Sequence, residues 1–575
     1  MFLPTTREEL QQLGWNRLDV VLVTGDSYID SPYIGVSVIG KVLVQAGFRV
    51  GIIAQPDIHS NKDIGRLGEP LLFWGITGGC IDSMVANYTP TGKRRKTDDY
   101  TPGGHNHLRP DRAVITYANL IRRYFKPTAP LVLGGIEASL RRVTHYDFWS
   151  DSIRRSILFD AKADLLVYGM AEKTIVPLAE HLKSQTDFRN LTGICYINDV
   201  IPAGYIELPA YPVVAADKRA FTDMFKAFYC NNDPLSATGL AQRQDTRYWI
   251  QNPPASPLTQ KELDAVHDLP FEHAQHPYYR KQGPVRALDT INFSILTHRG
   301  CYGECNFCAI SVHQGRTVQW RSESSILAEA KRMSEHPDFK GYIQDVGGPT
   351  ANMYGFECKK KLRSGGCHDR RCLFPKICDQ LRVRHGKLTE LLKKIREIHG
   401  IKKAFVRSGL RYDLILNDAL EGRNFLKEII YHHISGQLKV APEHCQNNVL
   451  NYMGKPHIER FLSFKKMFDE ISRSTDKKQY LTYYMIAAHP GCTFQDMQAL
   501  ATFSREKLQM IPEQIQIFTP TPSTFSSLMY WTGMDPESFA PLFVEKNPQN
   551  KDKQKMAVAK QPTTGSRYEK RKRTA

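Results

Sequence analysis

Short runs of consecutive hydrophobic residues alternate with amphipathic stretches along the first 180 residues of the chain. Such runs are typical of strands that are buried on both faces, and the stretches between them have helical periodicity. Glycines end several runs, as tight turns from strand to helix require. The pattern predicts an N-terminal α/β domain over residues 1–200 with a parallel sheet, whose strands cover residues 19–25, 49–55, 71–79, 130–138 and 163–172.

This pattern is interrupted between residues 201 and 285, where Pro, Gln and His are frequent. Such a composition predicts a connector with short helices. The alternation of strands and helices then resumes over residues 286–540. Six strands with mostly helical crossovers predict a barrel or partial barrel whose functional face lies at the carboxyl ends of the strands. The predicted strands are 290–297, 341–348, 403–409, 436–443, 479–488 and 513–520, and the main helices are 325–333, 387–400 and 460–471.

Composition and charge indicate a large globular protein with a basic end. The chain of 575 residues is too long for one core, and its 41% hydrophobic and 24% charged residues are ordinary for a soluble protein. No signal peptide or membrane-spanning run is visible, so we expect a cytoplasmic location and no membrane contact. The net charge is +18, and residues 546–575 hold ten Lys or Arg. We expect a mostly disordered basic tail over residues 541–575, and solvated surface at the basic stretches 92–96 and 103–112.

The spacing of the cysteines carries the strongest chemical signal. Seven of the twelve lie between residues 301 and 378, and such clustering in a large chain indicates metal or redox chemistry. Cys301, Cys305 and Cys308 form a C-x3-C-x2-C motif after the first predicted barrel strand. Three thiolates can hold three corners of an iron–sulfur cube and leave one iron open to an exogenous ligand. The alternative is a fourth protein ligand, either His298 or a distant cysteine.

This motif and its surroundings resemble the radical S-adenosylmethionine (SAM) superfamily over roughly residues 288–535. Phe307 precedes the last cysteine, and "DVGGPT" (345–350) resembles the glycine motif after the second strand. "KVAPEHCQNNVLNYMGKP" (439–456) and "HPGCT" (489–493) resemble later stretches of several branches. Together with its N-terminal half, the chain resembles the YgiQ-like radical SAM family.

The resemblance implies a 4Fe–4S cluster on Cys301, Cys305 and Cys308 that binds SAM by its amino and carboxylate groups. One electron then breaks the sulfonium bond, which yields methionine and a 5′-deoxyadenosyl radical that abstracts hydrogen from a substrate. A flavodoxin- or ferredoxin-type protein would supply the electron. The implied SAM contacts are Phe307 near adenine, Gly347 and Gly348 through their backbone, and Ser408 or Glu443 near the ribose or methionyl group. Without SAM, the paired glycines would simply allow a backbone turn, and Ser408 would cap the helix that follows it.

Four further cysteines lie in a predicted insertion at residues 357–380. Cys358, Cys367, Cys372 and Cys378 share their stretch with seven Lys or Arg and one Asp. Four thiols suffice for zinc or a second iron–sulfur cluster, and nearby cations lower the pKa of a thiol. The spacing matches neither common zinc nor common ferredoxin motifs. The alternative is a basic surface insertion whose cysteines are free or bind one structural ion.

The strand order of the N-terminal domain resembles the cobalamin-binding domains that precede some radical SAM barrels. However, "GDSYIDSPYIG" (25–35) lacks the histidine of the D-x-H-x-x-G motif, so cobalamin is not expected. The chain is therefore expected to be a radical SAM enzyme of unknown substrate. One alternative is RNA modification by the same chemistry, with nucleic-acid contacts suggested by the basic excess. The other is an iron–sulfur electron carrier or sensor without turnover.

Overall fold

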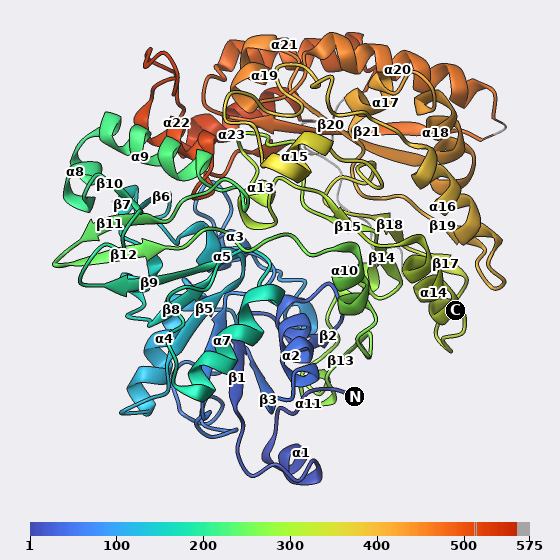
Figure 1. The fold of residues 1–575 in the computed structure, drawn as a ribbon. Coiled ribbons are helices and arrows are strands. Elements are labelled where there is room, and N and C mark those ends of the chain that lie inside the picture. The colour runs from blue at the N-terminus through green and yellow to red at the C-terminus, as the bar shows by residue number, and fades with distance from the viewer. Residues whose placement is uncertain (476, 511, 513–514, 560–575) are drawn as a thin grey trace.

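The computed structural model describes residues 1–475, 477–510, 512 and 515–559 (Figure 1). Its N-terminal half contains a nine-stranded sheet of order β10-β11-β12-β9-β8-β5-β4-β1-β3. The stretch from β8 to β3 is parallel throughout, as predicted. Its strands are β1 (Val20–Thr24), β3 (Val50–Ala54), β4 (Phe73–Thr77), β5 (Leu131–Gly134) and β8 (Leu165–Val167).

Alternate residues of the parallel strands face two separate cores. In β1, Leu22 joins the core beneath helices α2 (Gly35–Gln45) and α7 (Glu172–Ser184). Its neighbour Val21 joins the core beneath α4 (Ala113–Tyr124). Because helices cover both faces, the strands are hydrophobic at successive positions. The carboxyl ends of all these strands consequently meet at one edge of the sheet.

The structure differs from the sequence expectation between residues 201 and 285. This segment does more than connect, because part of it extends the N-terminal sheet and part packs on its core. Its strands lie at the end of the sheet where parallel and antiparallel pairs are mixed. Polar residues are frequent in these strands, so no hydrophobic run marks them in the sequence. The elements concerned are β10 (Ile206–Leu208), α9 (Lys218–Cys230), β11 (Leu240–Gln244) and β12 (Arg247–Gln251), which follow β9 (Ile194–Asn198).

In the C-terminal half, parallel strands pair in chain order, as in a partial barrel. β14 pairs with β18, β17 with β19, and β20 with β21, which also pairs with β22. These strands are β14 (Ser294–Leu296), β17 (Tyr342–Ile343), β18 (Asp345–Gly347), β19 (Lys403–Ala404), β20 (Gln437–Glu443), β21 (Tyr480–Ala487) and β22 (Gln516–Ile517). The predicted helices are present as α14 (Glu323–Ser334), α16 (Gly386–Glu397) and α20 (Ile458–Arg473).

The two halves pack directly against each other. Phe525 and Leu528 of α22 (Phe525–Thr532) belong to a core of the N-terminal half. The short helix α13 (Ile310–His313) contacts α5 (Gly135–Leu140) and lies between the halves in Figure 1. Across the described residues, the helices are all too short or too polar to cross a membrane.

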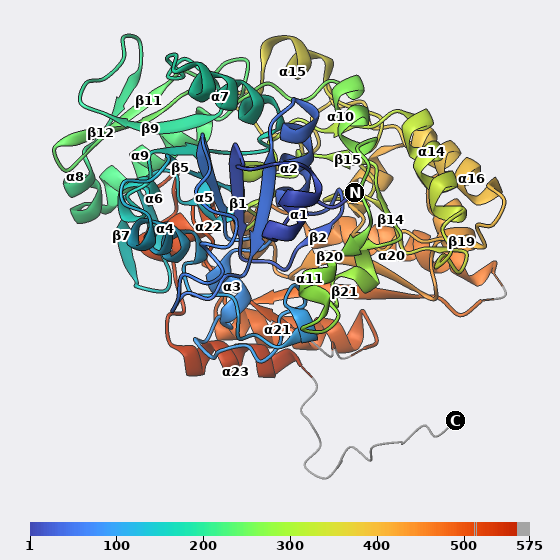
Figure 2. The same ribbon diagram turned by 90° about the horizontal axis from the view of Figure 1, so that it is seen from below.

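Part of the expected basic tail is an ordered helix. α23 (Pro548–Val558) packs beside α21 (Phe494–Glu506), as Figure 2 shows. Its buried Lys551 donates a hydrogen bond to the Tyr530 hydroxyl (2.8 Å). Burial lowers the pKa of this lysine to about 8. Composition did not reveal the helix because the side chains that it buries are mainly polar. The remainder of the expected tail, residues 560–575, lies outside the described residues.

We predict that Gln554 fixes α23 to the end of β21. Gln554 Oε1 accepts a hydrogen bond from Ala488 N–H (3.0 Å), and Nε2 donates to the Cys492 carbonyl (3.4 Å). Gln554→Ala leaves the N–H of the buried Ala488 without this acceptor, which should lower the free energy of unfolding by about 1–3 kcal/mol. Urea unfolding measures the change. The exposed Lys553 on the same helix provides a control, and equal midpoints for Gln554→Ala and Lys553→Ala would contradict the prediction.

Candidate functional site

The three cysteines of the C-x3-C-x2-C motif line one cavity of about 160 Å³, which we call the cysteine cavity. They lie in the loop between β15 (His298–Arg299) and α13. Gly303 leaves room for two of the sulfur atoms, since a Cβ at this position would lie 3.1 Å from Cys301 Sγ and 3.9 Å from Cys305 Sγ. The loop therefore directs its thiols into a common space.

Hydrogen-bond donors surround these sulfur atoms. Gly303 N–H donates to Cys301 Sγ (3.3 Å), and the Thr350 hydroxyl lies 3.7 Å from the same sulfur. Burial raises the pKa of Cys301, and it raises the pKa of Cys308 to about 12. Because metal ligands are thiolates, binding of iron here would displace protons from buried thiols.

Arg411 brings a positive charge to the cysteine cavity. Its Nη1 donates to Cys305 Sγ (3.6 Å), while Nε and Nη2 donate to Asp413 at 2.9 and 2.6 Å. Burial lowers the pKa of Arg411, but the charges of Asp413 and Cys305 outweigh burial and raise it. A guanidinium bonded to a ligand sulfur stabilises the thiolate form. No sequence motif marks Arg411, which lies three positions after Ser408 in the loop that follows β19.

The donor set fits an iron–sulfur cluster. Three soft ligands line one space, and N–H and guanidinium groups donate to their sulfurs. Within the described ranges, no three His, Cys, Asp or Glu side chains could hold a single metal ion. An iron–sulfur cluster does not require its ligands to converge on one ion, because each cysteine binds a different iron. His298 is already engaged, since its ring nitrogens lie 2.8 Å from Thr297 Oγ1 and 2.9 Å from the Thr350 carbonyl oxygen.

Phe307 and Glu443, two of the predicted SAM contacts, line the cysteine cavity. The Phe307 ring lies edge-on to His489, with ring centroids 6.3 Å apart. Glu443 follows an irregularity in β20 and has a φ of 68°. Its Oε1 lies 3.7 Å from Lys455 Nζ, and burial raises its pKa. The cavity wall thus carries a carboxylate and an ammonium group, which complement the two charged ends of an amino acid.

The other predicted SAM contacts, Gly347, Gly348 and Ser408, are not among the residues that line this cavity. A Cβ on Gly347 would lie 3.2 Å from the Ser408 side chain, and one on Gly348 would lie 2.7 Å from the His298 ring. Close packing therefore favours glycine at position 348, whereas at position 347 a side chain would meet only a tight contact. Ser408 Oγ donates to the Asp345 carboxylate and does not cap the following helix. Their contacts with SAM stay a prediction.

The four cysteines of the insertion differ in their surroundings. Cys358 is buried, and Cys367, Cys372 and Cys378 are half-buried. Cys358 and Cys372 pack in a small core with Tyr302. For a single ion such as zinc, the residues that the structure describes do not assemble a set of three ligands here.

A larger cavity of about 420 Å³, the interdomain chamber, lies between the two halves. One wall consists of the carboxyl ends of β1, β4, β5 and β8, where open α/β sheets commonly bind ligands. Leu296, Arg299, Ile310 and His313 contribute the opposite wall from the C-terminal half. Ile310 lines both the interdomain chamber and the cysteine cavity, so the two spaces are adjacent.

A buried ion pair between Glu172 and Arg299 lies in the wall of the chamber. The side chains are only 5% and 4% exposed, so each charge depends on its partner. Glu172 Oε2 has no hydrogen-bond partner within the described part of the chain. A buried acceptor without a donor is uncommon and marks a place where a ligand can supply one.

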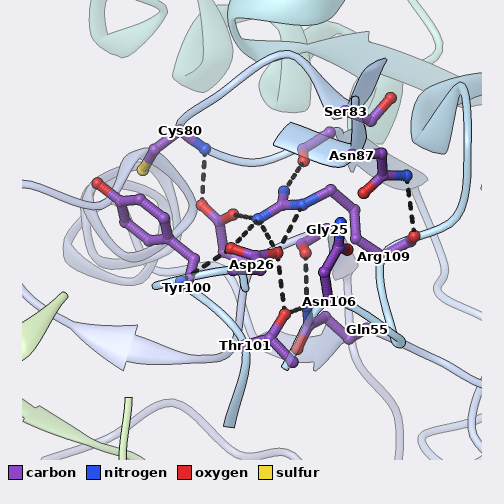
Figure 3. A network of polar contacts seen from close by, with 12 residues as sticks. Gly25, Asp26, Gln55, Cys80, Ser83, Asn87, Tyr100, Thr101, Asn106 and Arg109 are labelled. Atoms are coloured by element: carbon purple, nitrogen blue, oxygen red, sulfur yellow. Dashed lines mark hydrogen bonds and ion pairs between the residues drawn. The ribbon is translucent and has the colours of Figure 1, made fainter. Parts of the chain in front are cut away.

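A second buried network lies beside the chamber at the end of β1 (Figure 3). Arg109 Nη2 lies 2.7 Å from Asp26 Oδ1 and 3.0 Å from Asp98 Oδ2. Asp26 Oδ2 also accepts from Cys80 N–H (2.6 Å), and both of these residues line the chamber. Burial lowers the pKa of Arg109, but the two carboxylates outweigh burial and raise it. The expectation of solvated surface at residues 103–112 is therefore wrong for Arg109, whose partner Asp26 is distant in the sequence.

Comparison with known proteins identifies the class of protein to which this chain belongs. A family profile described as Radical SAM N-terminal matches residues 2–294, which confirms the predicted radical SAM class. A UPF0313 protein from Fusobacterium nucleatum is 54% identical and covers 97% of this chain and 98% of its own. One from Thermotoga maritima is 48% identical with the same coverage. The chain belongs to the UPF0313 family.

Two solved structures of radical SAM enzymes are similar in arrangement. TsrM from Kitasatospora setae, a methyltransferase with cobalamin and a 4Fe–4S cluster bound, is 14% identical, with 89% of this chain and 77% of that chain covered and a TM-score of 0.48. OxsB with aqua-cobalamin bound is 13% identical, with 91% and 56% covered and a TM-score of 0.49.

These structures correct one expectation. The missing histidine motif at residues 25–35 makes cobalamin unexpected, but both similar structures contain cobalamin, so this expectation is wrong.

We predict that Cys301, Cys305 and Cys308 are each required for a cluster that responds to SAM. After anaerobic reconstitution and reduction, the electron paramagnetic resonance spectrum of the wild type should change when SAM is added. Each Cys→Ala variant should lose this response, because the cavity loses one of its three soft ligands. The exposed Cys230 lies outside the cavity, so Cys230→Ala should behave like the wild type. A SAM response that persists in all three variants would rule out this ligand set.

Proposed function

We propose that this protein is a radical SAM enzyme that holds a 4Fe–4S cluster on Cys301, Cys305 and Cys308 and acts on a substrate in the interdomain chamber. One observation carries the proposal: the three cysteines line a cavity that shares Ile310 with a chamber of about 420 Å³. When bound, the cluster and SAM supply one-electron cleavage of the sulfonium bond, which yields methionine and a 5′-deoxyadenosyl radical. The chemistry that this pair would supply to the substrate is the removal of a hydrogen atom.

Side chains of the cysteine cavity would bind and orient SAM. Glu443 and Lys455 offer a carboxylate and an ammonium group to the amino and carboxylate ends of its methionyl part. Phe307 offers an apolar surface for the adenine ring. Arg411 offsets the negative charge of the thiolate at Cys305. These groups are fixed by buried contacts, which is how a protein positions a reactive cofactor.

The chamber favours an enzyme over a non-catalytic electron carrier. A carrier needs a route for electrons but has no use for an apolar chamber beside its cluster. Hydrophobic residues dominate the chamber walls, and such walls limit contact with water and side reactions of a radical. The free Glu172 Oε2 would accept a hydrogen bond, so the substrate is expected to carry an N–H or O–H group on an otherwise apolar body.

The release of 5′-deoxyadenosine tests this function. With dithionite as the electron donor and without added substrate, the wild type should slowly convert SAM to methionine and 5′-deoxyadenosine, because the radical takes hydrogen from another donor. Cys305→Ala should lose this activity, and Cys230→Ala should retain it. Chromatography of the quenched reaction measures the product. Equal release by the wild type and Cys305→Ala would leave the electron-carrier function as the better explanation.

A further inference from the structure

A basic segment covers the outer side of the Cys301 loop. Residues 357–384 include α15 (Lys359–Ser364), which lies at the surface of the molecule in Figures 1 and 2. Arg371 Nη1 donates to the Glu304 carbonyl (3.1 Å) and to Asn306 Oδ1 (2.6 Å), and both acceptors belong to the loop that carries the three cysteines. The segment is thus fixed to the loop by direct contacts.

Hydrophobic side chains also join the segment to the cysteine loop. Cys301 packs against a small core that includes Tyr302 of the loop and Leu373 of the segment. Cys372 and Ile377 pack against the same core, and both are partly exposed. A protein docked here would therefore lie within a few side chains of Cys301. Electron transfer falls steeply with distance, so this is a favourable place for a reductant to bind.

The exposed charged side chains of the segment are mainly basic, and we call the basic ones the basic face. Asp369 and Asp379 are the exposed acidic residues, and Asp369 is already paired with Arg370 (N–O distance 3.1 Å). Lys361 is instead buried, where it pairs with Glu357 (2.9 Å) and donates a hydrogen bond to the Arg316 carbonyl (2.8 Å), which fixes α15 to the chain after α13. The basic face comprises Lys359, Lys360, Arg363, Arg370, Lys376, Arg382 and Arg384.

We propose that the basic face is the docking site for an acidic one-electron carrier protein of the flavodoxin or ferredoxin type. The inference rests on the proposed function, because a cluster that cleaves SAM requires an electron. Complementary charge speeds the encounter of two proteins, and electron-transfer complexes use small, weak interfaces. A short patch of exposed lysines and arginines next to the cluster loop meets both requirements.

The position of the basic face favours a reductant over RNA. An RNA substrate would have to present a group to the interdomain chamber, but none of residues 357–384 lines that chamber. The segment instead covers the loop at Glu304 and Asn306. Charge alone would suit either partner, and the location is what distinguishes them.

Stopped-flow reduction of the reconstituted protein by reduced flavodoxin tests the proposal. The variant Lys359→Glu/Lys360→Glu/Arg363→Glu reverses three exposed charges on α15. Its second-order rate constant at low ionic strength should fall about tenfold or more, and its dependence on salt should become weaker. The corresponding triple Gln variant should lie between this variant and the wild type. The control reverses Arg17, Lys62 and Lys183, which are exposed on the N-terminal half, and should leave the rate unchanged.

Dithionite separates this proposal from the proposed function. Because a small reductant needs no docking site, all variants should be reduced by dithionite and release 5′-deoxyadenosine like the wild type. If dithionite supports this release but the α15 variant accepts electrons from flavodoxin at the wild-type rate, the docking site is overturned and the enzyme function stands. If the α15 variant instead loses salt-dependent binding of transfer RNA while its flavodoxin rate is unchanged, the basic face is an RNA surface and the proposal fails.

Discussion

The buried ion pair between Arg299 and Glu172 is the interaction on which the arrangement of the site depends. Arg299 is the last residue of β15 and comes two positions before Cys301. Glu172 is the first residue of α7, which follows the carboxyl end of β8 in the N-terminal sheet. The pair therefore joins the start of the cysteine loop to the carboxyl end of the parallel strands. Loss of one partner would leave a buried charge uncompensated, which typically costs about 3–5 kcal/mol. The ion pair thereby fixes the position of one wall of the interdomain chamber relative to the other.

Much of the fold could be predicted because its strands are buried on both faces. In β1, Val21 and Leu22 face different cores, so the strand is hydrophobic at successive positions and easily recognised. The cysteine motif was equally easy to recognise, since three soft ligands in one loop seldom serve a purpose other than metal or cluster binding. β11 and β12 were missed because they bury polar side chains, among them Gln242, Gln244 and Gln251, whose hydrogen bonds replace hydrophobic contacts. A continuous hydrophobic run marks a strand that is buried on both faces, but no such run marks a strand that buries glutamines.

The rest of the site depends on residues that are distant in sequence. Glu172 meets Arg299 across 127 positions, and Arg411 meets Cys305 across 106. No local pattern marks such partners, because each is an ordinary charged residue in its own segment. The same limit explains Arg109, which sits in a basic stretch but is buried between Asp26 and Asp98. It also explains α23, where a buried Gln554 bonds to backbone groups near residue 490.

The two sides of the cysteine loop have different chemical character. On its inner side, Ile310 lies between the cysteine cavity and an apolar chamber that the N-terminal sheet borders. On its outer side, Cys301 packs against a small core of the insertion, whose exposed charged side chains are mainly basic. A substrate that must meet a radical benefits from the apolar side, where contact with water is limited. A reductant that must dissociate after each electron benefits from the exposed side, where charge rather than apolar burial drives association. Separate routes would let each partner bind without displacing the other.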